Sequence, residues 1–136
     1  MPKYSQVVSR LQLSGILESL FSYHILFPPS HQGELGIIPG SMATPGFIVS
    51  GKGCVGSLFS ASHGAGRTMS RLDARNSISH HALKKYLAEH NVMLLGGTTE
   101  EAPQAYKDIH QVMDSQHDLI NIEGKIIPRI VRMSEE

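Results

Sequence analysis

A histidine set among small residues and followed by arginines is the segment of this chain best suited to chemistry. Its members are, in order, Ser62, His63, Gly64, Ala65, Gly66, Arg67 and Arg71. An imidazole can attack a phosphate, small neighbours let a nucleotide approach the backbone, and guanidinium groups offset phosphate charge. The segment therefore predicts a histidine nucleophile, His63, that attacks a phosphate. The alternative is a glycine-rich turn that happens to hold a histidine ahead of a helix.

A second loop of small residues, Pro39–Gly46, lies between two short predicted strands, Leu35–Ile38 and Gly46–Ser50. Such a loop can turn backbone N–H groups toward an anion. The simpler interpretation is a hairpin connection with two glycines. By itself the loop favours the hairpin connection.

The elements that must position His63 follow it directly. The pattern predicts a helix over Arg67–Asn76, which would place Arg67 and Arg71 on one face, one turn apart. Its N-terminal amides would then face the histidine loop. Ser79 is expected to cap a second helix from His80 to about His90. The side chains expected along one side of that helix are Leu83, Tyr86, Leu87 and His90.

The remaining pattern alternates strands and helices without a βαβ repeat. We expect a strand over Val92–Leu95 and a helix from Pro103 to about Asp118, because proline suits the first position of a helix. The residues of that helix expected to face inward are Ala105, Ile109, Val112 and Met113. A last strand is expected over Lys125–Met133, and a first helix over about Gln6–Phe21. The fold class predicted from this order is α+β, a mixture of short strands and helices.

Composition limits the possible functions. The chain has 136 residues, within the range of one domain, and 12 basic residues balance 12 acidic ones. A nonspecific nucleic-acid binder normally carries a basic excess, so any positive charge that meets RNA must be gathered locally. The single cysteine, Cys54, argues against a disulfide framework and a cysteine-rich zinc site. With no leader and no membrane-length apolar run, we expect a cytoplasmic protein.

The eight histidines do not suggest a metal site. His80 and His81 are adjacent and would point to different sides of a helix. His110 and His117 are seven apart, two turns along the predicted helix, which is too far for one ion. We expect all four at the surface.

Three segments together closely resemble the C-terminal part of RtcB-type RNA-splicing ligases. They are Gly33–Met42 (GELGIIPGSM), Ser62–Arg71 (SHGAGRTMSR) and Glu101–Ile109 (EAPQAYKDI). Three motifs in order and register are far more specific than any one of them. The resemblance runs from about Gln32 to Met133, so residues 1–31 stand apart as a non-matching segment and residues 32–136 as the RtcB-like region. It implies the C-terminal portion of the RtcB-like fold.

The resemblance implies an enzyme that joins RNA ends bearing a 3′-phosphate or 2′,3′-cyclic phosphate to a 5′-hydroxyl, in tRNA splicing or RNA repair, with GTP and Mn²⁺. It makes His63 the residue that becomes guanylylated, and Arg67 and Arg71 the residues that hold phosphate. Tyr106 would form the aromatic side of the purine pocket, or else be a buried core tyrosine. The residues implied to line the nucleotide are Pro39, Gly40, Ser41, Met42, Gly46, Gly64, Ala65, Gly66, Tyr106 and Met133.

This chain departs from the family pattern in two respects. The family takes its manganese ligands from upstream, from an Asp-x-x-Cys segment and several histidines, and none of these segments is present, so no metal ligand is predicted here. The lysine that contacts guanine near the family's C-terminus is also absent, and Met133 falls at or near its position. We therefore predict a truncated chain that is inactive alone and that a separate chain could complete by supplying the missing N-terminal part.

Two other hypotheses remain open at this point. One is a non-catalytic remnant, or a nucleotide- or anion-binding module that keeps part of the ligase fold. The other is a different histidine phosphotransferase built on the same loop.

Overall fold

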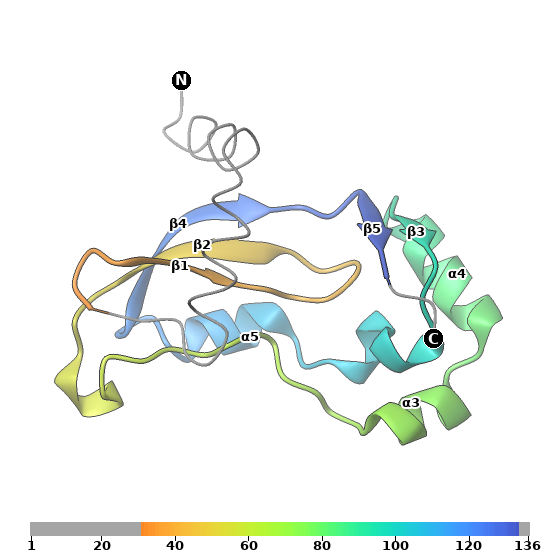
Figure 1. The fold of residues 1–136 in the computed structure, drawn as a ribbon, viewed down its shortest axis with the longest axis horizontal. Coiled ribbons are helices and arrows are strands. Elements are labelled where there is room, and N and C mark those ends of the chain that lie inside the picture. The colour runs from red at the N-terminus through yellow and green to blue at the C-terminus, as the bar shows by residue number, and fades with distance from the viewer. Residues whose placement is uncertain (1–30, 134–136) are drawn as a thin grey trace. The chain divides into compact units, whose positions relative to one another are not determined.

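The computed structural model describes residues 31–133 (Figure 1). These residues divide into two compact units. Unit 1 comprises residues 31–38, 47–63 and 116–124, and unit 2 comprises residues 39–46, 64–115 and 125–133. Helices and short strands are mixed, which confirms the α+β prediction. The helix predicted over Gln6–Phe21 lies outside the described residues. Within residues 31–133, no helix is long and apolar enough to cross a membrane.

Unit 1 is built on a three-stranded sheet with the order β1-β2-β4. Its strands are β1 (Leu35–Ile38), β2 (Gly46–Gly51) and β4 (Ile120–Ile126). β1 and β2 pair antiparallel, from Leu35 opposite Ser50 to Ile38 opposite Phe47. The predicted hairpin around Pro39–Gly46 is thus confirmed. β2 is the central strand and is buried from Phe47 onward, as expected for a strand with neighbours on both sides. A 3₁₀ turn, Val55–Ser57, follows it.

Unit 2 contains the remaining elements around an apolar core. Its helices are α3 (Arg71–Ser77), α4 (His80–Glu89) and α5 (Ile109–Asp114), with two 3₁₀ turns at Thr99–Glu101 and Pro103–Ala105. Two strands, β3 (Met93–Leu95) and β5 (Ile130–Arg132), pair in parallel. The buried core cluster consists of Met42, Leu83, Leu87, Val92 and Ala102.

Helix α4 and strand β3 confirm the sequence prediction. The Ser79 hydroxyl accepts a hydrogen bond from the Ala82 N–H at 3.1 Å, so the helix begins where the capping residue was expected. Leu83 and Leu87 are buried, Tyr86 is half-buried, and the exposed His90 ring stacks on Tyr86 at 4.2 Å. Local signals and core packing agree here, and the prediction succeeds.

The helix predicted over Arg67–Asn76 is wrong in its first turn. α3 begins at Arg71, and Ser70 caps it by accepting a hydrogen bond from the Asp73 N–H. Arg67 instead lies in an extended segment, so Arg67 and Arg71 do not share one helix face. The cause is a backbone bridge between Arg67 and Tyr106, with the Thr68 N–H donating to Ala105 O and the Lys107 N–H donating to Gly66 O, both at 2.9 Å.

The same bridge interrupts the helix predicted over Pro103–Asp118. Pro103 does open a 3₁₀ turn, but Tyr106 is extended (φ −111°, ψ 154°) and a separate helix, α5, starts after Asp108. Ala105, Ile109 and Met113 are buried as expected, whereas Val112 is half-buried. The predicted helix was wrong because an extended pairing with residues 66–68 satisfies the backbone that a helix would have used.

The strand predicted over Lys125–Met133 is also divided. β4 ends at Ile126 and β5 begins at Ile130, with Pro128 between them. Proline has no N–H to give to a strand ladder, which explains the break. The prediction missed the first part of β4, Ile120–Gly124.

Candidate functional site

His63 is exposed. Residues just before and just after it in the sequence are held by hydrogen bonds from their backbone N–H groups. The Ser62 N–H donates to Oε1 of the buried Gln116 at 2.8 Å, within unit 1. The Ala65 N–H donates to Pro39 O at 3.2 Å, within unit 2, and Ala65 is buried. His63 is therefore an accessible imidazole on a short segment whose two ends are anchored.

The glycines that follow His63 differ in what surrounds them. A Cβ atom placed on Gly64 would lie 3.3 Å from Pro39 O, a tight contact with backbone. Gly66 has φ +74°, which disfavours other residues, and the nearest atom to a Cβ placed there is Lys107 Cδ at 3.8 Å. Gly64 is therefore needed for close packing on Pro39, whereas Gly66 is needed for its backbone conformation.

The loop Pro39–Gly46 is rigid because its own groups fill it. A Cβ on Gly40 would lie 2.3 Å from Pro45 O, so no larger residue fits without a backbone shift. The Thr44 Oγ1 accepts from the Ser41 N–H at 2.7 Å and donates to the Ser41 Oγ at 2.8 Å. A site formed by this loop would therefore be largely preformed.

Two of the predicted nucleotide-lining residues have their side chains in the core of unit 2. Met42 is buried in the cluster with Leu83 and Leu87, and the partly buried Met133 packs against the same cluster. The Met133 N–H also donates to Leu95 O at 2.9 Å. Met42 and Met133 could therefore contribute mainly main-chain atoms or an apolar edge to a nucleotide site.

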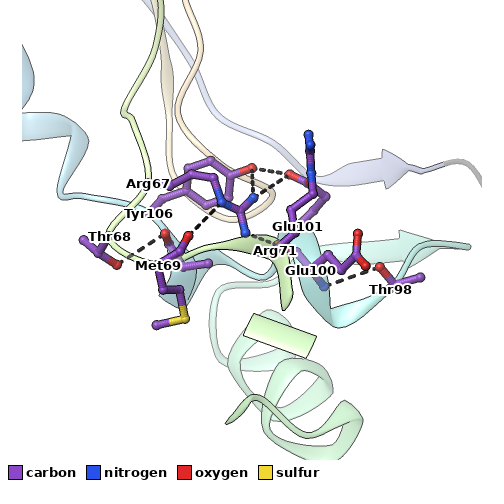
Figure 2. A network of polar contacts seen from close by, with 9 residues as sticks. Arg67, Thr68, Met69, Arg71, Thr98, Glu100, Glu101 and Tyr106 are labelled. Atoms are coloured by element: carbon purple, nitrogen blue, oxygen red, sulfur yellow. Dashed lines mark hydrogen bonds and ion pairs between the residues drawn. The ribbon is translucent and has the colours of Figure 1, made fainter. Parts of the chain in front are cut away.

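The two predicted phosphate-binding arginines converge on one carboxylate, that of Glu101 (Figure 2). Arg67 is half-buried and donates from Nη1 to Glu101 Oε2 at 3.4 Å, and its guanidinium lies over the Tyr106 ring, 5.0 Å from the centroid. Arg71 donates from Nε to Glu101 Oε1 at 3.1 Å, with 70% of its side chain exposed. The tertiary structure thus brings the arginines together, although the helix that was predicted to do so is absent.

Arg67, Arg71, Glu101 and Tyr106 form what we call the Glu101 cluster. Electrostatic interactions within it favour an ionised Glu101 and a neutral Tyr106. Burial alone would raise the pKa of Glu101, but hydrogen bonds from the Tyr106 hydroxyl and Arg71, with the charge of Arg67, outweigh it and lower the pKa. Burial and the bond to Glu101 raise the pKa of Tyr106. The hydrogen bond to Glu101 raises the pKa of Arg71.

Sequence reasoning missed Glu101 as a member of the site and used it only as the first residue of the family motif Glu101–Ile109. In the structure, Glu100 forms an ion pair with Arg75, next to the Glu101 cluster. A usable signal was present. Arg67, Arg71 and Arg75 recur every four residues, and two consecutive acids elsewhere in the chain offer them partners.

The comparisons with known proteins identify the family. The family model described as tRNA-splicing ligase RtcB matches residues 17–133, a range that begins ahead of Gln32. This chain belongs to the RtcB family. The RNA-splicing ligase RtcB of Escherichia coli K12 is 43% identical over 90 residues, covering 66% of this chain and 22% of that protein. The RtcB of Mycobacterium tuberculosis H37Rv is 34% identical over 109 residues, covering 76% of this chain and 25% of that protein.

An archaeal relative extends the comparison. The tRNA-splicing ligase RtcB of Nanoarchaeum equitans is 36% identical over 108 residues, covering 68% of this chain and 23% of that protein. The chain therefore spans about a fifth to a quarter of the length of the RtcB relatives it matches.

The manganese that the RtcB resemblance implies does not fit the described residues. No group of three or more His, Cys, Asp or Glu side chains within residues 31–133 is arranged to hold a metal ion. His80, His81, His110 and His117 are all exposed, which confirms their predicted place at the surface. His117 lies beyond the end of α5, so the prediction that it shares one helix with His110 was wrong.

Proposed function

We propose that this chain carries the histidine nucleophile of an RNA ligase that joins a 3′-phosphate or 2′,3′-cyclic phosphate to a 5′-hydroxyl with GTP as the activating nucleotide. The observation that carries the proposal is His63 itself. It is an exposed imidazole on an anchored small-residue segment, in a chain of the RtcB family.

In the proposed first step, a ring nitrogen of His63 attacks the α-phosphorus of GTP. A P–N bond forms, the bond from the α-phosphorus to the bridging oxygen breaks, and pyrophosphate leaves. A 2′,3′-cyclic phosphate end would first take up water, which breaks its P–O2′ bond and gives a 3′-phosphate and a 2′-hydroxyl. An oxygen of the RNA 3′-phosphate then attacks the phosphorus bound to His63, which frees His63 and leaves GMP on the RNA end. The 5′-hydroxyl finally attacks the activated 3′-phosphate, loses its proton and releases GMP as the phosphodiester forms.

The residues of unit 2 that the family resemblance assigns to the nucleotide suit the binding part of this scheme. The loop Pro39–Met42, Gly46 and the segment Gly64–Gly66 would line the nucleotide, and the packing of Gly40 and Gly64 on neighbouring backbone would hold these segments in one conformation. Tyr106 would offer a purine the ring face that Arg67 does not cover. The exposed guanidinium of Arg71 would contact phosphate.

The metal ligands are proposed to come from outside residues 31–133. Charge on a triphosphate must be offset as the imidazole attacks, and the described residues contain no group that could hold a metal ion. Segments elsewhere in a longer polypeptide, or a separate chain, would supply the metal ligands. We therefore expect no self-guanylylation by this chain alone.

The test is label transfer from α-³²P-GTP with Mn²⁺, in two contexts. One is the chain alone. The other is a chimera in which this chain replaces the matched 90 residues of the E. coli ligase. We expect no label on the chain alone, and an acid-labile, alkali-stable label on the chimera, as a phosphoramidate should give. His63→Ala should abolish the label, whereas His81→Ala, which changes an exposed histidine on α4, should leave it unchanged.

The possible outcomes separate the hypotheses. A label on the chain alone that His63→Ala removes would overturn the proposal that metal ligands come from elsewhere. A folded chimera that binds GTP but takes no label would favour the second candidate, a non-catalytic nucleotide- or anion-binding module. The absence of a metal-binding group within residues 31–133 is the observation that keeps this second candidate in view.

A further inference from the structure

We propose that Glu101 is a positioning residue that gives the two arginines different tasks. It holds the Nε edge of Arg71 so that the Nη1–Nη2 edge is presented to a phosphate, while Arg67 serves as an internal brace. The identity of that phosphate as part of GTP or an RNA end rests on the proposed function. The division between the arginines rests on the contacts of unit 2 alone.

Arg67 has little capacity left for a ligand. Its Nε donates to Met69 O at 3.1 Å, its Nη1 donates to Glu101 and to the Tyr106 hydroxyl at 3.2 Å, and its Nη2 donates to Glu100 O at 2.5 Å. Four of the five N–H groups of a guanidinium are accounted for in this way. The side chain is only 24% exposed, with one face on the Tyr106 ring. A bidentate grip on phosphate would require Arg67 to give up protein contacts.

Arg71 is in the opposite situation. Its contact within residues 31–133 is the bond from Nε to Glu101 Oε1, and 70% of its side chain is exposed. Because Nε is bonded to Glu101, the edge left for bidentate phosphate binding is the one formed by Nη1 and Nη2. A long exposed side chain loses rotamer freedom when it binds, so a partner that already fixes Nε reduces this cost.

Glu101 is itself held in place, as an orienting residue must be. Its Oε2 accepts from the Tyr106 hydroxyl and from Arg67, while its Oε1 accepts from Arg71 (Figure 2). Glu101 precedes Ala102, which is buried in the core cluster of unit 2. One carboxylate between two guanidinium groups leaves a net positive charge, so an anion is still attracted.

A competing view is that Glu101 occupies the place of a phosphate and must be displaced. The two views make opposite predictions for two variants of similar shape. Glu101→Gln loses the charge and has one side-chain oxygen, which can accept from Arg71 or from the Arg67–Tyr106 side but not from both. Glu101→Asp keeps the charge but is one methylene too short.

The experiment uses the whole chain, labelled with ¹⁵N, and inorganic pyrophosphate as the probe. Arginine Nε–H signals and pyrophosphate affinity are measured for wild type, Glu101→Gln, Glu101→Asp and Arg71→Lys, with Glu89→Gln on α4 as a control acid. Backbone amides of Leu83 and Leu87 report whether the core of unit 2 is intact in each variant.

We expect pyrophosphate to shift the Arg71 Nε–H signal and to leave that of Arg67 nearly unmoved. Arg71→Lys should weaken binding about tenfold, since lysine cannot hold Glu101 and grip phosphate at once. Glu101→Asp should broaden the Arg71 signal and weaken binding severalfold, and Glu101→Gln should weaken binding by less than Glu101→Asp. Glu89→Gln should leave both near wild type.

Three results would overturn the proposal. Tighter binding by Glu101→Gln with no loss in Glu101→Asp would make Glu101 a competitor for phosphate. An equal response of the Arg67 and Arg71 signals would remove the division between them. No pyrophosphate binding by folded wild-type chain would remove Arg71 as a phosphate contact. None of these depends on label transfer, so the proposed ligase function can fail while this proposal stands, and the reverse.

Discussion

Helix α4 and the Glu101 cluster belong to the same unit but are stabilised in different ways. α4 begins at a capping serine and buries Leu83 and Leu87, so its neighbours in sequence and its apolar face specify the same structure. The cluster joins residues 67 and 71 to residues 100–106 through charges and an extended backbone bridge. The comparison teaches that α4 is specified by its own sequence, whereas the candidate phosphate-binding part of unit 2 is specified by contacts distant in sequence.

The largest expected effect is in the apolar part. Leu87→Ala should lower the free energy of unfolding by about 2–5 kcal/mol, because it removes a fully buried side chain and leaves a cavity. Urea denaturation followed by circular dichroism measures it. The loss should be the same at pH 5 and pH 8, and a loss that varied with pH would mean that the core and the charged cluster are coupled.

The second-largest expected effect tests the structural role of Arg67. Arg67→Ala should cost roughly 1.5–3 kcal/mol, since the hydrogen bonds of a charged group are lost and the partly buried Glu101 loses one of its two arginine partners. The same urea experiment applies. Combining it with Glu101→Gln in a double-mutant cycle should show that the two losses are not additive, and strict additivity would contradict a direct interaction.

The helix cap is expected to matter less. Ser79→Ala removes the acceptor for the Ala82 N–H and should cost about 1 kcal/mol. Ser79→Asp, which restores an acceptor at the same place, should recover most of the loss. If alanine and aspartate were equally destabilising, the local specification of α4 would be in doubt.

Arg71→Ala should change stability by less than about 1 kcal/mol, because its ion pair with Glu101 is exposed on the arginine side. The contrast with Arg67→Ala sharpens the division between brace and phosphate contact. A loss as large as that of Arg67→Ala would show that Arg71 also braces the fold.

The smallest expected effect is a dependence of the free energy of unfolding on pH at low pH. The pKa of Glu101 lies below its ordinary value of 4.5, so its contribution to stability is present above that value and is lost as pH falls through the lower, folded value. The difference in unfolding free energy between wild type and Glu101→Gln should therefore shrink as the pH is lowered below about 4.5. A difference that stays constant down to pH 3 would contradict the lowered pKa.

The sequence predicted those parts of the fold in which local and tertiary preferences agree. β1, β2, α4 and β3 appear where hydrophobic pattern, glycine turns and the Ser79 cap placed them. The segments around Arg67 and Tyr106 were both predicted as helix, and both are extended there because each provides hydrogen-bond partners for the other. No local pattern contains that information, since the two segments are far apart in the chain.

By itself the sequence determined the family, the α+β class, and the residues at which chemistry is proposed, because His63 and its glycines form a motif that does not depend on long-range contacts. Only the tertiary structure decided how the arginines are used. Arg67 and Arg71 are similar in sequence, yet one has almost all its donors satisfied by protein and the other has only one edge held. The reason is that the capacity of a guanidinium to bind a ligand depends on which donors the folded chain leaves unused.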